Sequence, residues 1–170
     1  QRSGAYTLTI TKKGITIGIV DDNSLFYAAQ TLKQLANMTR VEDPASLLIK
    51  DYPDVLFRGT VEGFYGQPWS HADRIEQIHF YGRIKLNTYI YGPKDDLITA
   101  PQLAQTLSRR GTEHIKELAK EAAHNKVNFV WAIHPGQDIQ WNLTDSMNIL
   151  SKFEKMYDLG YALSPFSSMI

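Results

Sequence analysis

The first third of the chain begins with two short runs in which apolar and polar residues alternate, at residues 5–10 and 15–19. The runs flank a turn sequence that ends in Gly14. Alternation on both sides of a glycine-containing turn predicts a β-hairpin. The apolar positions are Tyr6, Leu8 and Ile10 in the first run and Ile15, Ile17 and Ile19 in the second.

Helical spacing follows the hairpin. Residues 21–24 have the sequence Asp-Asp-Asn-Ser, which suits the start of a helix. The apolar positions that then recur every three or four residues are Leu25, Ala28, Ala29, Leu32 and Leu35. We therefore expect a β-β-α piece over residues 1–50. Because a hairpin with one helix is a small unit for independent stability, this piece is typical of the end of a larger N-terminal α/β domain.

Proline-containing turns at residues 43–46 and 51–54 bracket a short connection, and we place a domain boundary there. After it, strand and helix patterns alternate. Parallel strands with crossover helices are the structure that such alternation predicts. The prediction for residues 51–170 is an incomplete TIM (β/α)8 barrel of about three βα units. The expected strands cover residues 55–61, 88–91 and 128–133, and the expected helices cover residues 71–85, the region around 115–122 and residues 145–160.

Two of the expected helices have explicit start signals. Ser70 is followed three residues later by Asp73, as in a capping box, and this helix would bury Ile75 and Ile78. Either Thr144 or Asp145 would cap the last helix, and Gly160 suits its end. The apolar positions of the last helix are Met147, Leu150, Phe153 and Tyr157.

Each expected strand after the boundary leads into a loop with Gly or Pro and with polar or aromatic residues. In a (β/α)8 barrel, the loops that follow the carboxyl ends of the strands form the active site. The pattern therefore predicts a single rim. Its expected members are Gly63, Tyr65, Trp69, Lys94, Asp95, Asp96, His134 and Asp138.

The composition restricts what this rim could bind. Lys plus Arg and Asp plus Glu both number 18, whereas nucleic-acid and anionic-membrane binders carry a basic excess. The chain has no Cys, which excludes disulfides and thiolate chemistry. No second His stands at ligand spacing from His134, and the glycines match neither a P-loop nor a dinucleotide motif. We expect no metal, no cofactor, no nucleic-acid partner and no membrane span.

The chain starts with Gln1-Arg2-Ser3-Gly4, without an initiator Met or an apolar signal core. Such a start is typical of an internal cut. The compartment is therefore left open, with secretion or export to a periplasm among the alternatives, although no signal peptide is present in these residues.

The rim residues are compatible with more than one role. Lys94 could bind sugar hydroxyls or a phosphate, or it could form a surface ion pair with Asp95 or Asp96. The two aspartates suit an acid–base pair or a turn. Tyr65 and Trp69 suit sugar stacking or the filling of a barrel end.

Two motifs carry a family resemblance. Residues 57–96 include V-E-G-F-Y-G-Q-P-W and Y-G-P-K-D-D, and this stretch closely resembles the family 84 glycoside hydrolases. These enzymes are β-N-acetylglucosaminidases, and they include O-GlcNAcases and enzymes once called hyaluronidases. The later segments F-V-W-A-I-H-P-G-Q-D-I and K-F-E-K-M-Y-D-L-G resemble the same family, and the β-β-α piece resembles the end of its N-terminal α/β domain.

The resemblance implies an activity and a partial site. The expected reaction removes terminal β-linked N-acetylglucosamine from a glycan or glycoprotein by substrate-assisted, retaining hydrolysis through an oxazoline. The resemblance assigns sugar contacts to the backbone carbonyl of Gly63 and to Lys94, and it places Tyr65 in the same pocket. Asp95 and Asp96 belong to the motif but not to the catalytic pair.

The catalytic aspartate pair of the family follows the fourth barrel strand, and no aspartate occurs after Gly160. The resemblance therefore implies that the pair is absent and that this chain alone is inactive. Residues 101–111 and 164–170 can be encoded so that a shifted reading frame restores family-like sequence, and we hypothesise a frameshifted or misassembled gene product. An incomplete barrel has an unpaired edge, so we expect poor solubility or a molten state. The alternative is a non-enzymatic glycan-binding or assembly module.

Overall fold

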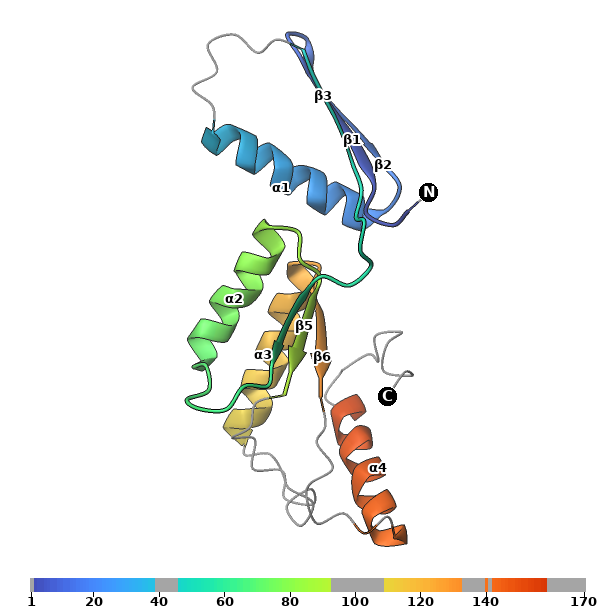
Figure 1. Ribbon diagram of the computed structural model, residues 1–170, viewed down its shortest axis with the longest axis vertical. Helices are drawn as coiled ribbons and strands as arrows, with labels where there is room; N and C mark the ends of the chain where they lie inside the picture. Colours follow the sequence, from blue (N-terminus) through green and yellow to red (C-terminus); the bar gives the residue numbers. More distant parts are fainter. Residues whose placement is uncertain (1, 39–45, 93–108, 133–139, 141, 159–170) are drawn as a thin grey trace. The chain divides into compact units, whose positions relative to one another are not determined.

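The computed structural model of the 170-residue chain describes residues 2–38, 46–92, 109–132, 140 and 142–158 (Figure 1). The described residues form two units: Gln1–Arg58 together with Gly82–Leu86, and Gly59–Tyr81 together with Asn87–Ile170. The first unit contains β1 (Tyr6–Thr11), β2 (Gly14–Ile19), α1 (Asp22–Met38) and β3 (Leu47–Asp51). The second contains β4 (Gly59–Glu62), all but the last two residues of α2 (His71–Arg83), β5 (Thr88–Tyr91), α3 (Arg109–His124), β6 (Asn128–Trp131) and α4 (Leu143–Asp158).

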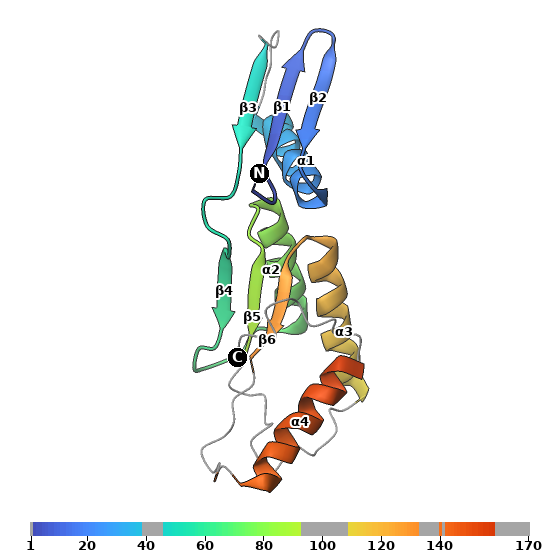
Figure 2. The same ribbon diagram turned by 90° about the vertical axis from the view of Figure 1, so that its right-hand side faces the viewer.

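The first unit is a three-stranded antiparallel sheet in the order β2-β1-β3 with α1 packed against it (Figure 2). The register pairs Leu8 of the central strand with Ile17 on one side and with Ile49 on the other. Leu8 is fully buried, and it packs with Tyr6 and with Tyr27 and Ala28 of α1. The predicted hairpin and the predicted helix on its apolar face are therefore confirmed.

The expectation of a short connection before residue 51 is wrong, because β3 lies there. Residues 47–51 pair antiparallel with β1, which makes the first unit β-β-α-β rather than β-β-α. The strand has only five residues, and its partner lies about 40 residues earlier in the chain. A strand this short shows too little alternation to be recognised without its partner.

The buried face of α1 also differs from the predicted one. Leu25 is 49% exposed, whereas Ser24 and Tyr27 are buried. The Ser24 hydroxyl donates to a carboxylate oxygen of Asp21 at 2.7 Å, and the Ser24 backbone N–H donates to the same oxygen at 2.8 Å. Asp21 therefore caps the helix, and the cap turns residues 24, 27, 28 and 31 toward the sheet in place of Leu25.

The second unit contains a parallel sheet in the order β4-β5-β6. Its central row aligns Val61, Ile90 and Val130. Helices α2 and α3 lie side by side over one face of the sheet, and His71 of α2 contacts Glu117 of α3 at 2.8 Å (Figures 1 and 2). An antiparallel sheet followed by parallel βα units confirms the α/β part of the prediction, and the domain boundary after residue 50 stays a prediction.

Several predicted ends are shifted in this unit. The strand expected over residues 55–61 starts only at Gly59, and α2 ends at Arg83. The helix ends there because Lys85 has a positive φ of 63° and its N–H donates to the Gly82 carbonyl. Ile133, the expected end of the third strand, lies outside the described residues.

The predicted cap of α4 is wrong. Asn142 precedes the helix, and its side-chain oxygen accepts the Asp145 N–H at 2.9 Å. Asp145 in turn accepts the N–H groups of Gln140 and Asn142. Asp145 thus occupies the third helical position of a capping box rather than the cap itself.

Candidate functional site

The carboxyl ends of the three parallel strands form one edge of the second sheet, where Glu62, Tyr91 and Trp131 are the last paired residues. The backbones stay together beyond them. The Gly92 N–H donates to the Glu62 carbonyl at 3.0 Å, and the Ala132 N–H donates to the Tyr91 carbonyl at 2.7 Å. The residues that leave this edge are therefore held side by side.

Three small residues, Gly63, Gly92 and Ala132, follow the strands at this edge. Side chains alternate along a strand, so these residues belong to the face of Val61 and Ile90, opposite the helices. A Cβ added at Gly92 would lie 3.1 Å from the Ala132 Cβ, which is a tight fit. This face therefore has backbone rather than large side chains at its surface near the edge.

Gly63 is less constrained than Gly92. A Cβ there would meet only Val61 at 3.5 Å and the Gly92 oxygen at 3.9 Å, which are ordinary contacts. The described residues thus give no steric reason for glycine at this position. Its suggested role, a backbone carbonyl offered to a sugar hydroxyl, stays a prediction.

The loop after Gly63 presents aromatic rings. Tyr65 is 87% exposed, and Phe64 contacts Trp69 with their ring centroids 5.4 Å apart. Gly66 has a φ of +116°, a conformation that other residues rarely adopt. Most of the Tyr65 surface is therefore exposed to solvent.

The other predicted rim residues cannot be placed. Lys94, Asp95, Asp96, His134 and Asp138 lie outside the described residues, as does the chain after Gly160. Of the predicted rim, the structure locates Gly63, Tyr65 and Trp69, and it does not test whether Lys94 comes close to them.

A buried ion pair that was not predicted from the sequence lies directly beside Gly63. Glu62 is 1% exposed, and Arg74 of α2 donates to it from Nε at 3.0 Å to both carboxylate oxygens and from Nη2 at 2.7 Å. The Tyr89 hydroxyl donates to the second oxygen of Glu62. One signal could have indicated this pair: a Glu at the end of a strand, with an Arg in the first turn of the following helix.

The two groups that donate to Glu62, the Arg74 guanidinium and the Tyr89 phenol, both have a raised pKa. Burial disfavours the charge of Arg74, but hydrogen bonds and the negative charge of Glu62 outweigh burial and raise the Arg74 pKa. Burial and the hydrogen bond to Glu62 raise the pKa of the Tyr89 phenol. The guanidinium also lies 5.0 Å from the centre of the Tyr91 ring. The helix-facing side of the edge is therefore a closed polar cluster surrounded by aromatic rings.

A second polar group joins α2 to α3. His71 contacts Glu117, its ring stacks on that of His114 at 4.0 Å, and His79 contacts Glu121 at 3.2 Å. Within the described residues no three acidic or histidine side chains are arranged to hold a metal ion. The same part of the chain contains no helix that is long and apolar enough to cross a membrane.

Comparison with known protein families matches two different family models to the two parts of the chain. A family model described as beta-N-acetylglucosaminidase matches residues 58–164, and a model of domain 2 of glycosyl hydrolase family 20 matches residues 1–52. Among curated proteins, protein O-GlcNAcase from Rattus norvegicus and from Mus musculus are each 34% identical over 94 residues, which is 55% of this chain. The chain spans only about a tenth of their length, since the match covers 10% of each.

Solved structures show similarity over most of the chain. CpGH84B is 35% identical with a TM-score of 0.79, and the match covers 94% of this chain and 29% of that one. CpGH84D is 30% identical with a TM-score of 0.77 over 94% of this chain and 28% of that one. A mutant O-GlcNAc hydrolase from Thermobaculum terrenum is 31% identical with a TM-score of 0.57, over 62% of this chain and 23% of that one. Since the family model matches more than half of the chain, the chain belongs to the family 84 β-N-acetylglucosaminidases.

Proposed function

We propose that this chain is the first part of a β-N-acetylglucosaminidase catalytic domain. It comprises an incomplete (β/α)8 barrel over residues 51–170, preceded by the end of an N-terminal α/β domain over residues 1–50. The carboxyl edge of β4 and β5 forms part of the pocket for terminal β-linked N-acetylglucosamine. The observation that carries this proposal is the side-by-side placement of Gly63 and Gly92, which leaves accessible backbone where the family motif begins.

Each proposed contact has a chemical role. The Gly63 carbonyl accepts a hydrogen bond from a sugar hydroxyl, and the Lys94 ammonium donates to the sugar and its acetamido group. The exposed Tyr65 ring lines the same pocket. A glycan or glycoprotein with N-acetylglucosamine is the partner, and no cofactor takes part.

We propose that these 170 residues do not supply all the groups that the chemical step requires. In substrate-assisted hydrolysis the acetamido carbonyl attacks the anomeric carbon, the leaving oxygen takes a proton from a general acid, and water later opens the oxazoline. Two aspartates support these steps in the family, and no aspartate follows Gly160 here. We expect the chain to bind the sugar weakly and not to turn it over.

Two assays on the full 170-residue chain test this function. Titration with N-acetylglucosamine, followed by the amide NMR signals of Gly63 and Gly92, should show saturable shifts that Lys94→Met weakens. The matched control, Lys126→Met, removes a lysine from a different turn and should leave the affinity unchanged. A chromogenic N-acetylglucosaminide should remain intact. Turnover would refute the inference that the catalytic aspartate pair is absent. Unchanged NMR signals would refute the proposal that this edge of the sheet binds the sugar.

A non-enzymatic glycan-binding module is the second candidate. The observation that favours it is Tyr65, whose 87% exposed ring suits stacking on a sugar. Such a module binds longer glycans better than the monosaccharide, and Tyr65→Ala removes that preference. A pocket for the terminal sugar alone shows no preference for length.

A further inference from the structure

A buried carboxylate stands one residue before the proposed sugar contact. Glu62 closes β4, and its side chain is in contact with Arg74 of α2 and Tyr89 of β5. Both carboxylate oxygens are occupied by donors from the protein. Glu62 is 1% exposed, so its side chain is covered by the protein.

The backbone of the same residue joins the two strand ends. The Glu62 carbonyl accepts the Gly92 N–H at 3.0 Å, and that carbonyl belongs to the peptide group whose nitrogen is that of Gly63. Glu62 therefore connects β4 to β5 twice, through its side chain and through its main chain. The orientation of the peptide group between Glu62 and Gly63 and the position of Gly92 both depend on this residue.

The need for such a connection follows from the weakness of β4 itself. The strand has four residues, and among the described residues it pairs only with β5. The chain then enters a loop with glycine at 63 and 66, which restrain the backbone poorly. Rigid support by neighbouring groups is what holds binding residues in their productive geometry.

We propose that Glu62 is a positioning residue of the N-acetylglucosamine pocket: through Arg74, Tyr89 and Gly92 it fixes the peptide that leads into Gly63, and so the place from which the Gly63 backbone meets the sugar. This inference rests on the proposed function for its sugar-binding consequence. Its structural part, the restraint of the Gly63 and Gly92 backbone, stands separately. The competing explanation is that the ion pair stabilises α2 on the sheet and nothing more.

Amide hydrogen exchange in the full chain separates the two explanations. Glu62→Gln keeps the shape of the side chain and removes its charge. We expect exchange at Gly92 to accelerate about tenfold relative to exchange at Ala132. The Ala132 N–H is the internal control, because it makes the equivalent bond to Tyr91 one strand further along. Equal acceleration at both amides would mean general destabilisation and would overturn the proposal.

Variants of the partners provide a second measurement that retains the Glu62 carboxylate. Tyr89→Phe should accelerate exchange at Gly92, whereas Tyr81→Phe should not. Tyr81 is equally buried, but its hydroxyl bonds Thr60 instead. Arg74→Lys should restore part of the protection that Arg74→Met removes. If Glu62→Gln does not fold, these four variants decide the question alone, and identical behaviour of the two tyrosine variants would overturn the proposal.

Titration with the sugar tests whether Glu62 affects binding. With N-acetylglucosamine as the probe, Glu62→Gln should weaken binding about tenfold, and Tyr81→Phe should leave it unchanged. If the unsubstituted chain shows no binding while Gly92 still responds selectively, the proposed function fails and the positioning role stands. If binding occurs and Glu62→Gln leaves it unaltered, the positioning role fails and the proposed function stands.

Discussion

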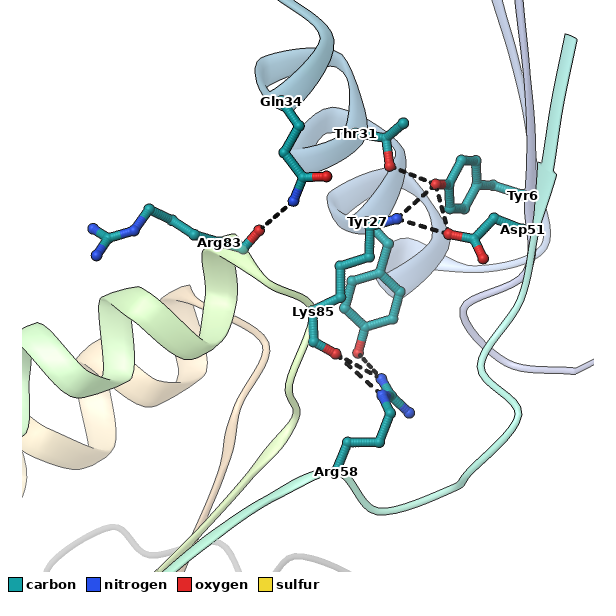
Figure 3. A network of polar contacts seen from close by, with 8 residues as sticks. All are labelled: Tyr6, Tyr27, Thr31, Gln34, Asp51, Arg58, Arg83 and Lys85. Atoms are coloured by element: carbon teal, nitrogen blue, oxygen red, sulfur yellow. Dashed lines mark hydrogen bonds and ion pairs between the residues drawn. The ribbon is translucent and has the colours of Figure 1, made fainter. Parts of the chain in front are cut away.

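Lys85 shows how one residue can be held in an unfavourable conformation by its contacts. Its φ of 63° is in the left-handed region, which costs a residue with a side chain about 1–2 kcal/mol. Its ammonium donates to Asp51 at 2.7 Å and to the Tyr6 hydroxyl at 2.8 Å, and Arg58 donates twice to its carbonyl (Figure 3). All of these residues belong to the first unit, and their contacts offset the backbone strain.

Lys126 is a natural control for this residue. It occupies the corresponding turn, between α3 and β6, with a φ of 56°. Its side chain makes no ion pair or hydrogen bond with the residues that the structure describes. The two positions therefore share the backbone strain and differ in the contacts.

Replacing each lysine by glycine should change stability in opposite directions. Lys126→Gly removes strain and should raise the free energy of unfolding by about 0.5–1 kcal/mol. Lys85→Gly also loses the bonds to Asp51 and Tyr6, and we expect a net loss of about 1–2 kcal/mol, a modest value because Asp51 is partly exposed. Amide hydrogen exchange in β5 and β6, the strands that follow the two turns, measures both changes as local opening free energies. Stabilisation by Lys85→Gly would show that the contacts contribute nothing.

Asp21 should make the first unit sensitive to acid. Burial raises the pKa of the Asp21 carboxyl, but hydrogen bonds from Ser3, Ser24 and Gly4 outweigh this effect and lower the pKa to about 2. Because the folded pKa lies below the unfolded value, the contribution to stability is complete above about pH 4 and is lost as the pH falls toward 2. Amide exchange at Leu8 between pH 5 and 2 should show this loss. Asp21→Asn should start less stable and show a smaller change, and a parallel pH dependence in the variant would contradict the assignment.

At the scale of elements, both well-described caps of the second unit consist of reciprocal pairs. Ser70 and Asp73 bond each other at the start of α2, and the Ser70 hydrogen bonds lower the Asp73 pKa. Asn142 and Asp145 do the same for α4. The first pair follows from the sequence, but the second does not, because Asn142, Thr144 and Asp145 are all acceptable caps on spacing alone.

The cap of α4 can be tested by comparing two neighbours. Asn142→Ala leaves the Asp145 N–H without its acceptor and should cost about 1 kcal/mol of helix stability. Thr144→Ala lies inside the helix and should change stability by less than about 0.5 kcal/mol. Amide exchange over residues 145–150 measures both effects. A larger effect at Thr144 would contradict the assignment of Asn142 as the cap.

On the scale of the whole molecule, the second unit exposes apolar groups on two elements. Val61 on the sheet is exposed, and so are Met147 and Leu150 on α4. Exposed apolar side chains favour association with other molecules or with hydrophobic dyes. The isolated chain is therefore expected to be poorly soluble or molten.

Dye binding tests that expectation. The chain should bind the dye ANS and lack a sharp thermal transition. Met147→Lys together with Leu150→Glu should reduce dye binding and aggregation, while the matched exchange Lys116→Glu on the exposed side of α3 should not. A monodisperse sample with a cooperative transition would contradict the expectation.

The sequence alone determined the local elements of this protein, whereas the role of its candidate site residues stays a prediction. Alternation and helical spacing are local properties, so the hairpin, α1, the strand at residues 88–91 and the Ser70 cap follow directly from them. The V-E-G-F-Y-G motif likewise identified the family, because it lies within one short stretch.

Only the tertiary structure decided which distant residues meet. The pairing of β3 with β1, the burial of Ser24 in place of Leu25, and the contacts of Glu62 with Arg74 and Tyr89 depend on side chains from separate elements. Their energies come from burial and from hydrogen bonds that exist only after the chain has folded. A pattern along the sequence records what each residue prefers, whereas these partners are chosen by geometry in space.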